Sequence, residues 1–302
     1  MEKIPLFLIS LLLTLNAHAA GSKAPQKTGN SCVSDSFCTY GEMPLQNQGA
    51  STLLWYINDK EKIKVPSDPG WCGAVAGMMA LYGMKNHNPK VKWNSWMDDK
   101  AENKYGVWKT GLDFKTDFKN GGTYTNETYS GINNLLNKAS NFKSKFLSYA
   151  SSSASSASIK DEIKAQKHVE YLSICEYKVE IKRTLAADLN YNQEIKARHA
   201  KVGYYEVLKE ITGCHALALN GYDGNRLIIN DPWGRVYTVD IENNSYAYQS
   251  GSNIFSTSRP RVTYGSLKDK TWDNIAHFMG FAGMHTTHTI LTGRIKFGIY
   301  QN

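Results

Sequence analysis

The sequence lacks any apolar run long enough to cross a membrane. Its one long run, from Ile4 to Leu15, falls well short of the ~20 apolar residues that a spanning helix needs. Ala17-His18-Ala19 then provides a small-x-small cleavage signal, so we expect residues 1–19 to be a secretory signal peptide. No cysteine follows that site, which argues against a lipid anchor. We therefore expect a secreted or periplasmic protein with no stable membrane anchor.

Clustered positive charge, internal repeats and a convincing metal motif are also missing. The formal net charge is +8, but the basic residues are scattered and no basic run is interleaved with aromatic residues. That distribution argues against nucleic-acid binding. His285 and His288 are spaced like metal ligands, but no third ligand lies near them in the sequence. We expect no metal, no other cofactor and no nucleic-acid partner.

Cysteine is scarce, and the five cysteines are an odd number. In the oxidising compartment that a secretory signal implies, spare thiols tend to pair, which leaves one cysteine over. If Cys72 is the free thiol, Cys32 and Cys38 can close a small loop and Cys175 and Cys214 can form a second bridge. The alternative is five reduced cysteines, some of them simply buried.

Helix signals prevail in the first half of the chain. Residues 20–42 are rich in Gly, Ser, Lys and Asn, which is typical of an irregular N-terminal extension. Residues 72–83 predict a tightly packed helix that ends at Gly83, and another helix is expected within 123–140. Residues 149–158 are nearly pure Ser and Ala, which indicates a flexible surface loop.

Strand signals dominate after a short helix over residues 158–166. The segments that favour strands are 168–179, 204–212, 215–222, 226–230 and 235–241. We therefore expect an α+β fold in which one domain spans residues 43–302. Its helical part reaches about residue 150 and its β part begins at about residue 159, after the Ser/Ala-rich loop.

Cys72 is placed as a reactive thiol would be. It follows the turn Pro69-Gly70-Trp71 and begins the small-residue helix. A thiol at a helix N-terminus faces the positive end of the helix dipole and free backbone N–H groups, which favour the thiolate and can also bind an oxyanion. A buried structural cysteine is the alternative, and a matching histidine and acid weigh against it.

His215 and Asp231 lie on two expected strands that a hairpin turn joins. Asp223-Gly224 is the turn signal, and it lies at the midpoint between the two residues. We therefore expect Asp231 opposite His215 or one residue away, within reach of a carboxylate–imidazole hydrogen bond. Asn230 should point to the other face of the strand. Alone, His215 would be interpreted as a core histidine and Asp231 as the start of an Asp-Pro turn.

Three motifs give the chain a resemblance to a known family. They are Gly70-Trp71-Cys72-Gly73-Ala74, Gly213-Cys214-His215-Ala216-Leu217 and Asn230-Asp231-Pro232-Trp233-Gly234. In this order they resemble the papain-like cysteine peptidase superfamily, closest to its bacterial C39-like branch. The resemblance implies a two-lobe papain-like fold, with a helical lobe that carries Cys72 packed on an antiparallel β-sheet or barrel lobe that carries His215 and Asp231.

The resemblance also implies a glutamine that donates a hydrogen bond to the oxyanion. The segment Pro44-Leu45-Gln46-Asn47-Gln48-Gly49 resembles the family's glutamine segment, and Gln48 is the candidate, with Gln46 as the alternative. Residues 50–71 separate this segment from Cys72, which is a longer interval than the family usually has.

Together these residues predict an exported cysteine peptidase that acts on peptides or proteins. Cys72 attacks the amide carbonyl, His215 transfers the proton, Asp231 orients the imidazole, and water releases the acyl-enzyme. Two alternatives stay open. Acyl transfer, or cleavage of a cell-wall or isopeptide amide, would use the same three residues, and a non-catalytic binding protein could retain the peptidase fold.

Overall fold

The computed structural model of the chain describes residues in twelve segments, and the statements below concern these segments. They are 32–40, 43–65, 69–87, 92–93, 97, 104–138, 144–150, 154–166, 168–183, 204–250, 253–264 and 286–300. The expected signal peptide and His285 lie outside them, and the side chain of His288 is not described.

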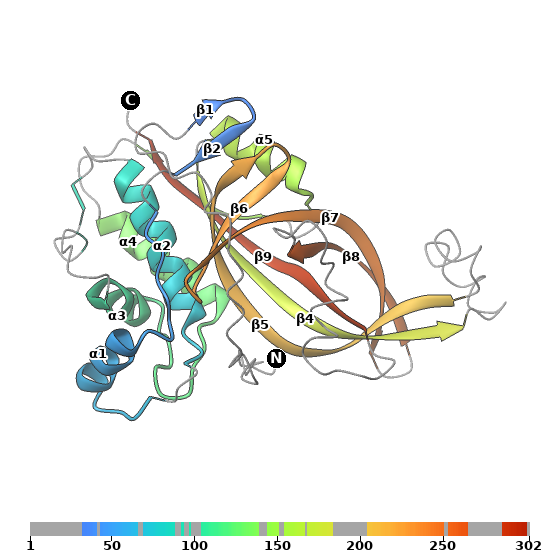
Figure 1. The fold of residues 1–302 in the computed structure, drawn as a ribbon, viewed down its shortest axis with the longest axis horizontal. Coiled ribbons are helices and arrows are strands. Elements are labelled where there is room, and N and C mark those ends of the chain that lie inside the picture. The colour runs from blue at the N-terminus through green and yellow to red at the C-terminus, as the bar shows by residue number, and fades with distance from the viewer. Residues whose placement is uncertain are drawn as a thin grey trace.

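After two short strands, four helices follow one another along the chain, and most of the strands come after them (Figure 1). The helices are α1 (Ser51–Glu61), α2 (Cys72–His87), α3 (Lys104–Asp113), α4 (Thr125–Lys138) and α5 (Ser156–Gln166). The strands are β1 (Cys32–Ser34), β2 (Phe37–Thr39), β3 (Ser144–Ala150), β4 (Val169–Arg183), β5 (Tyr204–Asp223), β6 (Arg226–Asp231), β7 (Arg235–Ser250), β8 (Asn253–Tyr264) and β9 (Thr286–Tyr300). No helix among these is both long and apolar enough to span a membrane.

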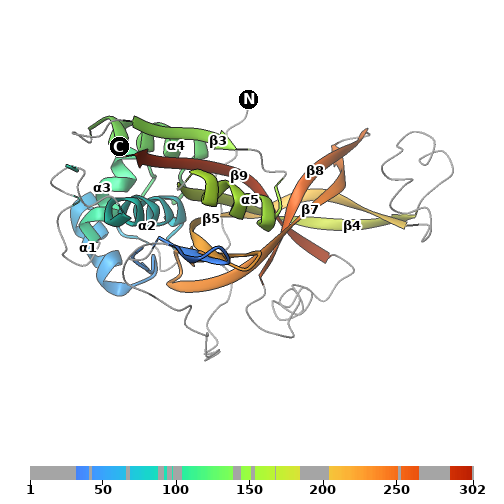
Figure 2. The ribbon, with the colours of Figure 1, turned by 90° about the horizontal axis from the view of Figure 1, so that it is seen from above.

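The strands form one sheet that closes on itself. Neighbouring strands follow the order β1-β2-β5-β4-β9-β8-β7-β6, and β3 adds to β9. Because β6 also pairs with β5, the strands β5, β4, β9, β8, β7 and β6 form a ring. The pairing is antiparallel except for a short parallel contact between β5 and β7. Figure 2 shows helices α1 to α4 gathered at one end, while β4, β7 and β8 extend away from them. The α+β fold with an antiparallel sheet is therefore confirmed.

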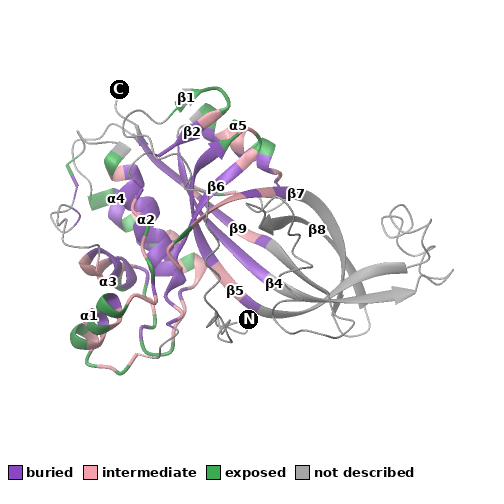
Figure 3. Cartoon of the chain, in the orientation of Figure 1, coloured by how far each residue is buried: buried purple, intermediate pink, exposed green. Residues whose placement is uncertain are grey.

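Helices α2 and α5 cover opposite faces of this sheet. Adjacent residues of a strand point to opposite faces, and Glu170 and Tyr171 are adjacent on β4. Burial raises the pKa of Tyr171, and the nearby Cys72 of α2 raises it further. Glu170 binds Arg294, which also binds Glu162 of α5. The side toward α2 therefore carries the candidate site, and Figure 3 shows dense burial where α2 meets the strands.

Helix α2 continues past Gly83, where the sequence predicted its end. It runs to His87, so that prediction was wrong. A Cβ built on Gly83 would lie 2.8 Å from the terminal methyl carbon of Met43. The glycine therefore permits close packing inside the helix, and it does not cap the C-terminus.

The Ser/Ala-rich segment 149–158 is not one continuous loop. Strand β3 runs to Ala150, and helix α5 already begins at Ser156. The side chain of Ser156 is buried, and its hydroxyl accepts a hydrogen bond from the backbone N–H of Ile241. Small polar residues are thus used here for close packing under β7, which the composition alone did not reveal.

The expected irregular extension, residues 20–42, contains the hairpin of β1 and β2. Strand β2 pairs with the end of β5, so this part of the extension belongs to the sheet. A disulfide between Cys32 and Cys38 closes the hairpin, as the cysteine count predicted. The covalent link compensates for strands that are only three residues long.

Candidate active site

Cys72 is the first residue of α2 and the one cysteine that forms no disulfide. The backbone N–H of Val75 donates to the carbonyl of Trp71, so the N–H groups of residues 72–74 lie at the open end of the helix. The turn before the helix is fixed by the indole of Trp71, whose Nε1 donates to the carbonyl of Phe118 at 3.1 Å. The thiol is therefore held at the N-terminus of a helix, where the first backbone N–H groups have no partner within the helix.

The loop of residues 117–123 packs directly against this turn. The N–H of Gly122 donates to the carbonyl of Gly70 at 2.8 Å. A Cβ built on Gly73 would lie 2.5 Å from Cβ of Thr123, so only glycine fits after the cysteine without movement. This close approach explains why glycine stands next to Cys72, and it restricts the backbone that carries the thiol.

The imidazole of His215 lies against the carboxylate of Asp231. Its Nε2 is 2.9 Å from Oδ1, and both side chains are mostly buried. The same Oδ1 accepts the backbone N–H of Trp233 at 2.8 Å. Cys72 lies close enough to the imidazole to raise the pKa of His215. The structure thus brings together all three residues that the motifs singled out.

The register of the hairpin differs from the one that the sequence predicted. Asp223 pairs with Arg226, and a bulge then shifts the register so that Ala218 pairs with Asn230. Continuing this pairing by one residue places Asp231 two residues from the position opposite His215, not at it or one away. Because side chains alternate with a period of two, the shift keeps His215 and Asp231 on the same face.

Asn230 points away from the imidazole, as expected from strand alternation. It is buried, and its side-chain oxygen accepts a hydrogen bond from the side-chain amide of Asn220 at 3.2 Å. Asn230 therefore contributes to the core on the other face of β6.

The charges around His215 favour its protonated form. Burial alone would lower the pKa of His215, but Asp231 and Cys72 outweigh it and raise that pKa from 6.5 to about 10. An imidazolium is therefore stable across the neutral range, and it is the partner that a Cys72 thiolate needs.

Gln48 lies beside the turn that carries Asp231. Its backbone N–H donates to the carbonyl of Pro232 at 2.6 Å, and Asn47 forms a bridge with Trp233. The side chain of Gln48 is buried, and its Oε1 has no hydrogen-bond partner among the described residues. Gln46 is more exposed, and its side-chain amide donates to the carbonyl of Asn47.

Residues 50–71 lie between the glutamine segment and Cys72 in the sequence. Helix α1 fills half of this interval and buries Leu53 and Ile57 in the core. A Cβ built on Gly49 would lie 3.0 Å from the ring of Trp233. The glutamine segment therefore packs on the turn that follows Asp231. The extra residues therefore fold as an added helix.

A second disulfide adjoins the histidine. Cys175 and Cys214 are bonded, as the odd cysteine count predicted, and they pair directly across β4 and β5. The next pair along the ladder is Ile174 and His215. The bridge therefore ties the strand that carries the imidazole to its neighbour.

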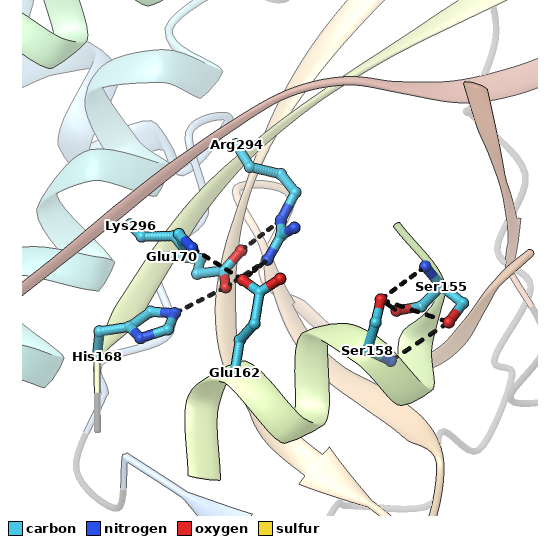
Figure 4. A network of polar contacts seen from close by, with 7 residues as sticks. All are labelled: Ser155, Ser158, Glu162, His168, Glu170, Arg294 and Lys296. Atoms are coloured by element: carbon cyan, nitrogen blue, oxygen red, sulfur yellow. Dashed lines mark hydrogen bonds and ion pairs between the residues drawn. The ribbon is translucent and has the colours of Figure 1, made fainter. Parts of the chain in front are cut away.

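On the opposite face of the sheet, a buried charged cluster joins α5, β4 and β9 (Figure 4). Its acids are Glu162 and Glu170, and its bases are His168, Arg294 and Lys296. One ligand-type atom each from Glu162, His168 and Glu170 lie within 4.8 Å of one another, a spacing that could suit a metal ion. Arg294 and Lys296 bind the same carboxylates, so the negative charge that a metal would need is already balanced. No motif in the sequence indicated this cluster.

Comparisons with known proteins support one family. A family model described as the Peptidase_C39 like family matches residues 42–255. No curated protein matches the chain. Among solved structures, a metal-containing protein from Archaeoglobus fulgidus is 8% identical, with a TM-score of 0.13, and the match covers 53% of this chain and 80% of that one. A likeness that weak carries no argument about fold or metal.

Proposed function

Because the chain belongs to the Peptidase_C39 like family, a C39-like branch of the papain-like peptidases, we propose that it is an exported cysteine peptidase with Cys72, His215 and Asp231 as its triad. The observation that carries this proposal is the imidazole of His215. It hydrogen-bonds Asp231 through Nε2, and Cys72 is close enough to raise its pKa. A peptide or protein is the substrate.

In the proposed reaction, the Cys72 thiolate attacks the carbonyl carbon of the scissile amide. The N–H groups at the start of α2 and the side-chain amide of Gln48 donate hydrogen bonds to the developing oxyanion. The imidazolium of His215 gives its proton to the leaving amine, and a thioester to Cys72 remains. His215 then takes a proton from water as the water attacks the thioester, which releases the acid and restores the thiol. Asp231 holds the imidazole in one tautomer throughout.

Gln48 is the better oxyanion donor of the two glutamines. It is buried beside the Asp231 turn, whereas the amide of Gln46 already donates to a neighbouring carbonyl. The two disulfides fit the proposed export, because such bonds persist in oxidising compartments. We also propose that the helical part and the strand ring correspond to the two lobes of papain-like enzymes.

A thiol-reactive inhibitor tests the proposal. Iodoacetamide should label the native protein at Cys72 with one equivalent, and the labelling rate should fall strongly in His215→Ala. A mixed peptide library analysed by mass spectrometry should then show hydrolysed peptides. Joined peptides would instead identify acyl transfer, and rapid labelling without any turnover would identify a binding protein on this fold. Slow labelling, equal in both variants, would contradict a reactive Cys72–His215 pair.

A further inference from the structure

We propose that Tyr237 is a positioning residue that holds the carboxylate of Asp231 against His215. This inference rests on the proposed triad and adds a fourth residue to it. Tyr237 lies on β7, the strand that follows the Asp231 turn.

The strand register places Tyr237 on the correct face. In the β6–β7 ladder, Asp231 is opposite Arg235 and Ile229 is opposite Tyr237. Opposed residues share a face, and so do residues two apart on one strand. Tyr237 is therefore a diagonal neighbour of Asp231. Since β6 lies between β5 and β7, Tyr237 approaches the carboxylate from the side away from His215.

The hydroxyl of Tyr237 meets the carboxylate in a half-buried environment. The side chain packs against the core, and its hydroxyl interacts with both Asp231 and Arg235. Burial, followed by the charge of Asp231, raises the pKa of Tyr237 to about 12. The hydroxyl therefore keeps its proton over the whole range in which a cysteine peptidase works, and it remains a hydrogen-bond donor to the carboxylate.

Donors from two different elements then restrict the carboxylate. The N–H of Trp233 comes from the turn, and the hydroxyl of Tyr237 comes from the next strand. A carboxylate that can rotate away from Nε2 of His215 would stabilise the imidazolium less. Tyr237 thus acts on the imidazole only through Asp231.

The test uses Tyr237→Phe, which removes only the hydroxyl. Iodoacetate is the probe, because this anion reacts fastest with a thiolate that has an imidazolium beside it. The second-order rate of Cys72 alkylation is measured against pH in the full chain, and its alkaline limb reports the pKa of His215. We expect that limb near pH 10 in the unsubstituted protein. In Tyr237→Phe it should move down by about 0.5–1 pH unit, because a looser carboxylate stabilises the imidazolium less.

Two controls separate positioning from a general structural effect. Tyr149→Phe removes a hydroxyl that donates to the carbonyl of Thr125 at 3.0 Å, and it should leave the limb unchanged. In an Asp231→Ala background, Tyr237→Phe should cause no further shift, because the two residues act as one unit.

The result overturns the inference if the limb of Tyr237→Phe stays in place or moves up. A shift that persists without Asp231 also overturns it. If Cys72 of the unsubstituted protein shows no alkaline limb, the inference falls with the triad. If the limb is present but no peptide is cleaved, the proposed peptidase activity fails while the result for Tyr237 still stands.

Discussion

Two neighbouring side chains, those of Asp231 and Cys72, favour the protonated form of the His215 imidazole. Burial opposes its charge, but Asp231 and Cys72 raise its pKa from 6.5 to about 10. A pKa that is higher in the folded state stabilises the fold fully below the unfolded value of about 6.5. That contribution is lost as the pH rises through about 10. The alkaline limit of activity should therefore be the deprotonation of this imidazolium.

Replacing Asp231 should damage turnover more than substrate binding. Asp231→Ala should lower kcat by about two or more orders of magnitude with a smaller change in KM, because the imidazole loses its orienting partner. Asp231→Asn should be milder, since an amide oxygen can still accept the Nε2 hydrogen bond. Asp231→Asn should also move the alkaline limit of kcat/KM below pH 10, because the carboxylate charge that raises the pKa of His215 is gone.

Asn230→Ala is the matched control for those kinetics. Asn230 neighbours Asp231 but bonds Asn220 on the other face of the strand, so its loss should affect stability more than kcat. A large fall in kcat in Asn230→Ala, with a nearly unchanged kcat in Asp231→Ala, would show that the assignment of Asp231 as the orienting acid is wrong.

Cys72→Ala should abolish peptide hydrolysis and leave the fold intact. The thiol is the nucleophile in the proposed reaction, and alanine is tolerated at the first position of a helix. Circular dichroism and thermal melting of the two proteins should agree closely while turnover disappears. Peptide hydrolysis by Cys72→Ala at the rate of the unsubstituted protein would contradict the proposed mechanism.

Motif order located Cys72, His215 and Asp231 from the sequence because each stands beside residues that shape its local backbone. Tyr237 was not found. Its only sequence signal is its spacing from Arg235 on a strand, and that spacing becomes informative only when the β6–β7 register is known. The sequence could not separate Gln48 from Gln46 for the same reason, since the burial that favours Gln48 in the proposed reaction depends on the fold.

At the scale of elements, the hairpin of β5 and β6 was predicted but its register was not. The turn signal at Asp223-Gly224 was interpreted as the centre of symmetry. The pair Asp223 and Arg226 instead places the centre after Gly224, and a bulge between Gly221 and Leu219 shifts it again. A bulge depends on packing against neighbouring strands, so the turn residues alone could not reveal it. The correct face was predicted because the total shift is an even number of residues.

The disulfide between Cys175 and Cys214 should stabilise the strand that carries His215. Replacing both cysteines with serine removes the bridge without leaving a new free thiol. The loss should be about 2–5 kcal/mol of the free energy of unfolding, because the unfolded chain regains the freedom of a long loop. Urea melts should show a lower free energy of unfolding, and Cys72 should be alkylated more slowly.

The other bridge provides a control of the same kind. Cys32 and Cys38 are separated by 6 residues, against 39 for Cys175 and Cys214, so their bridge restricts the unfolded chain less. The double serine variant at Cys32 and Cys38 should lose less stability and leave the alkylation rate unchanged. Equal losses of stability in the two double variants would show that neither loop length nor closeness to His215 determines the effect of a bridge.

At the scale of the whole molecule, the buried charged cluster connects segments that the sequence keeps far apart. Arg294 of β9 binds Glu170 of β4 through two of its nitrogens, at 2.8 and 2.9 Å from the carboxylate oxygens. The two residues are more than a hundred positions apart in the sequence. Glu162 of α5 joins the same guanidinium. Composition and periodicity predicted α5 and β4 separately, but no local pattern predicts which strand brings the compensating charge. This is why the fold class was predictable from the sequence and the cluster was not.

The cluster should make the protein sensitive to acid. Burial alone would raise the pKa of both Glu170 and Glu162. His168 and Arg294 outweigh it at Glu170, and Lys296 and Arg294 outweigh it at Glu162, so both pKa values are lowered. A carboxyl whose folded pKa is lowered contributes stability above its unfolded value of about 4.3. That contribution disappears as the pH falls through the lower folded value. Thermal melts should therefore show a plateau near neutral pH and a decline below about pH 4.

Removing Arg294 should both weaken the fold and change this pH dependence. Arg294→Met leaves the fully buried Glu170 without its guanidinium, and breaking a buried pair in this way costs about 3–5 kcal/mol. Burial then raises the pKa of Glu170, so the decline in stability should begin at a higher pH. Glu170→Gln in the same chain should restore part of the loss, because no charge is left buried. Lys62→Met, at the exposed Lys62–Asp59 pair, should change little. Melts of Arg294→Met that decline at the same pH as those of the unsubstituted protein would show that acid acts elsewhere in the molecule.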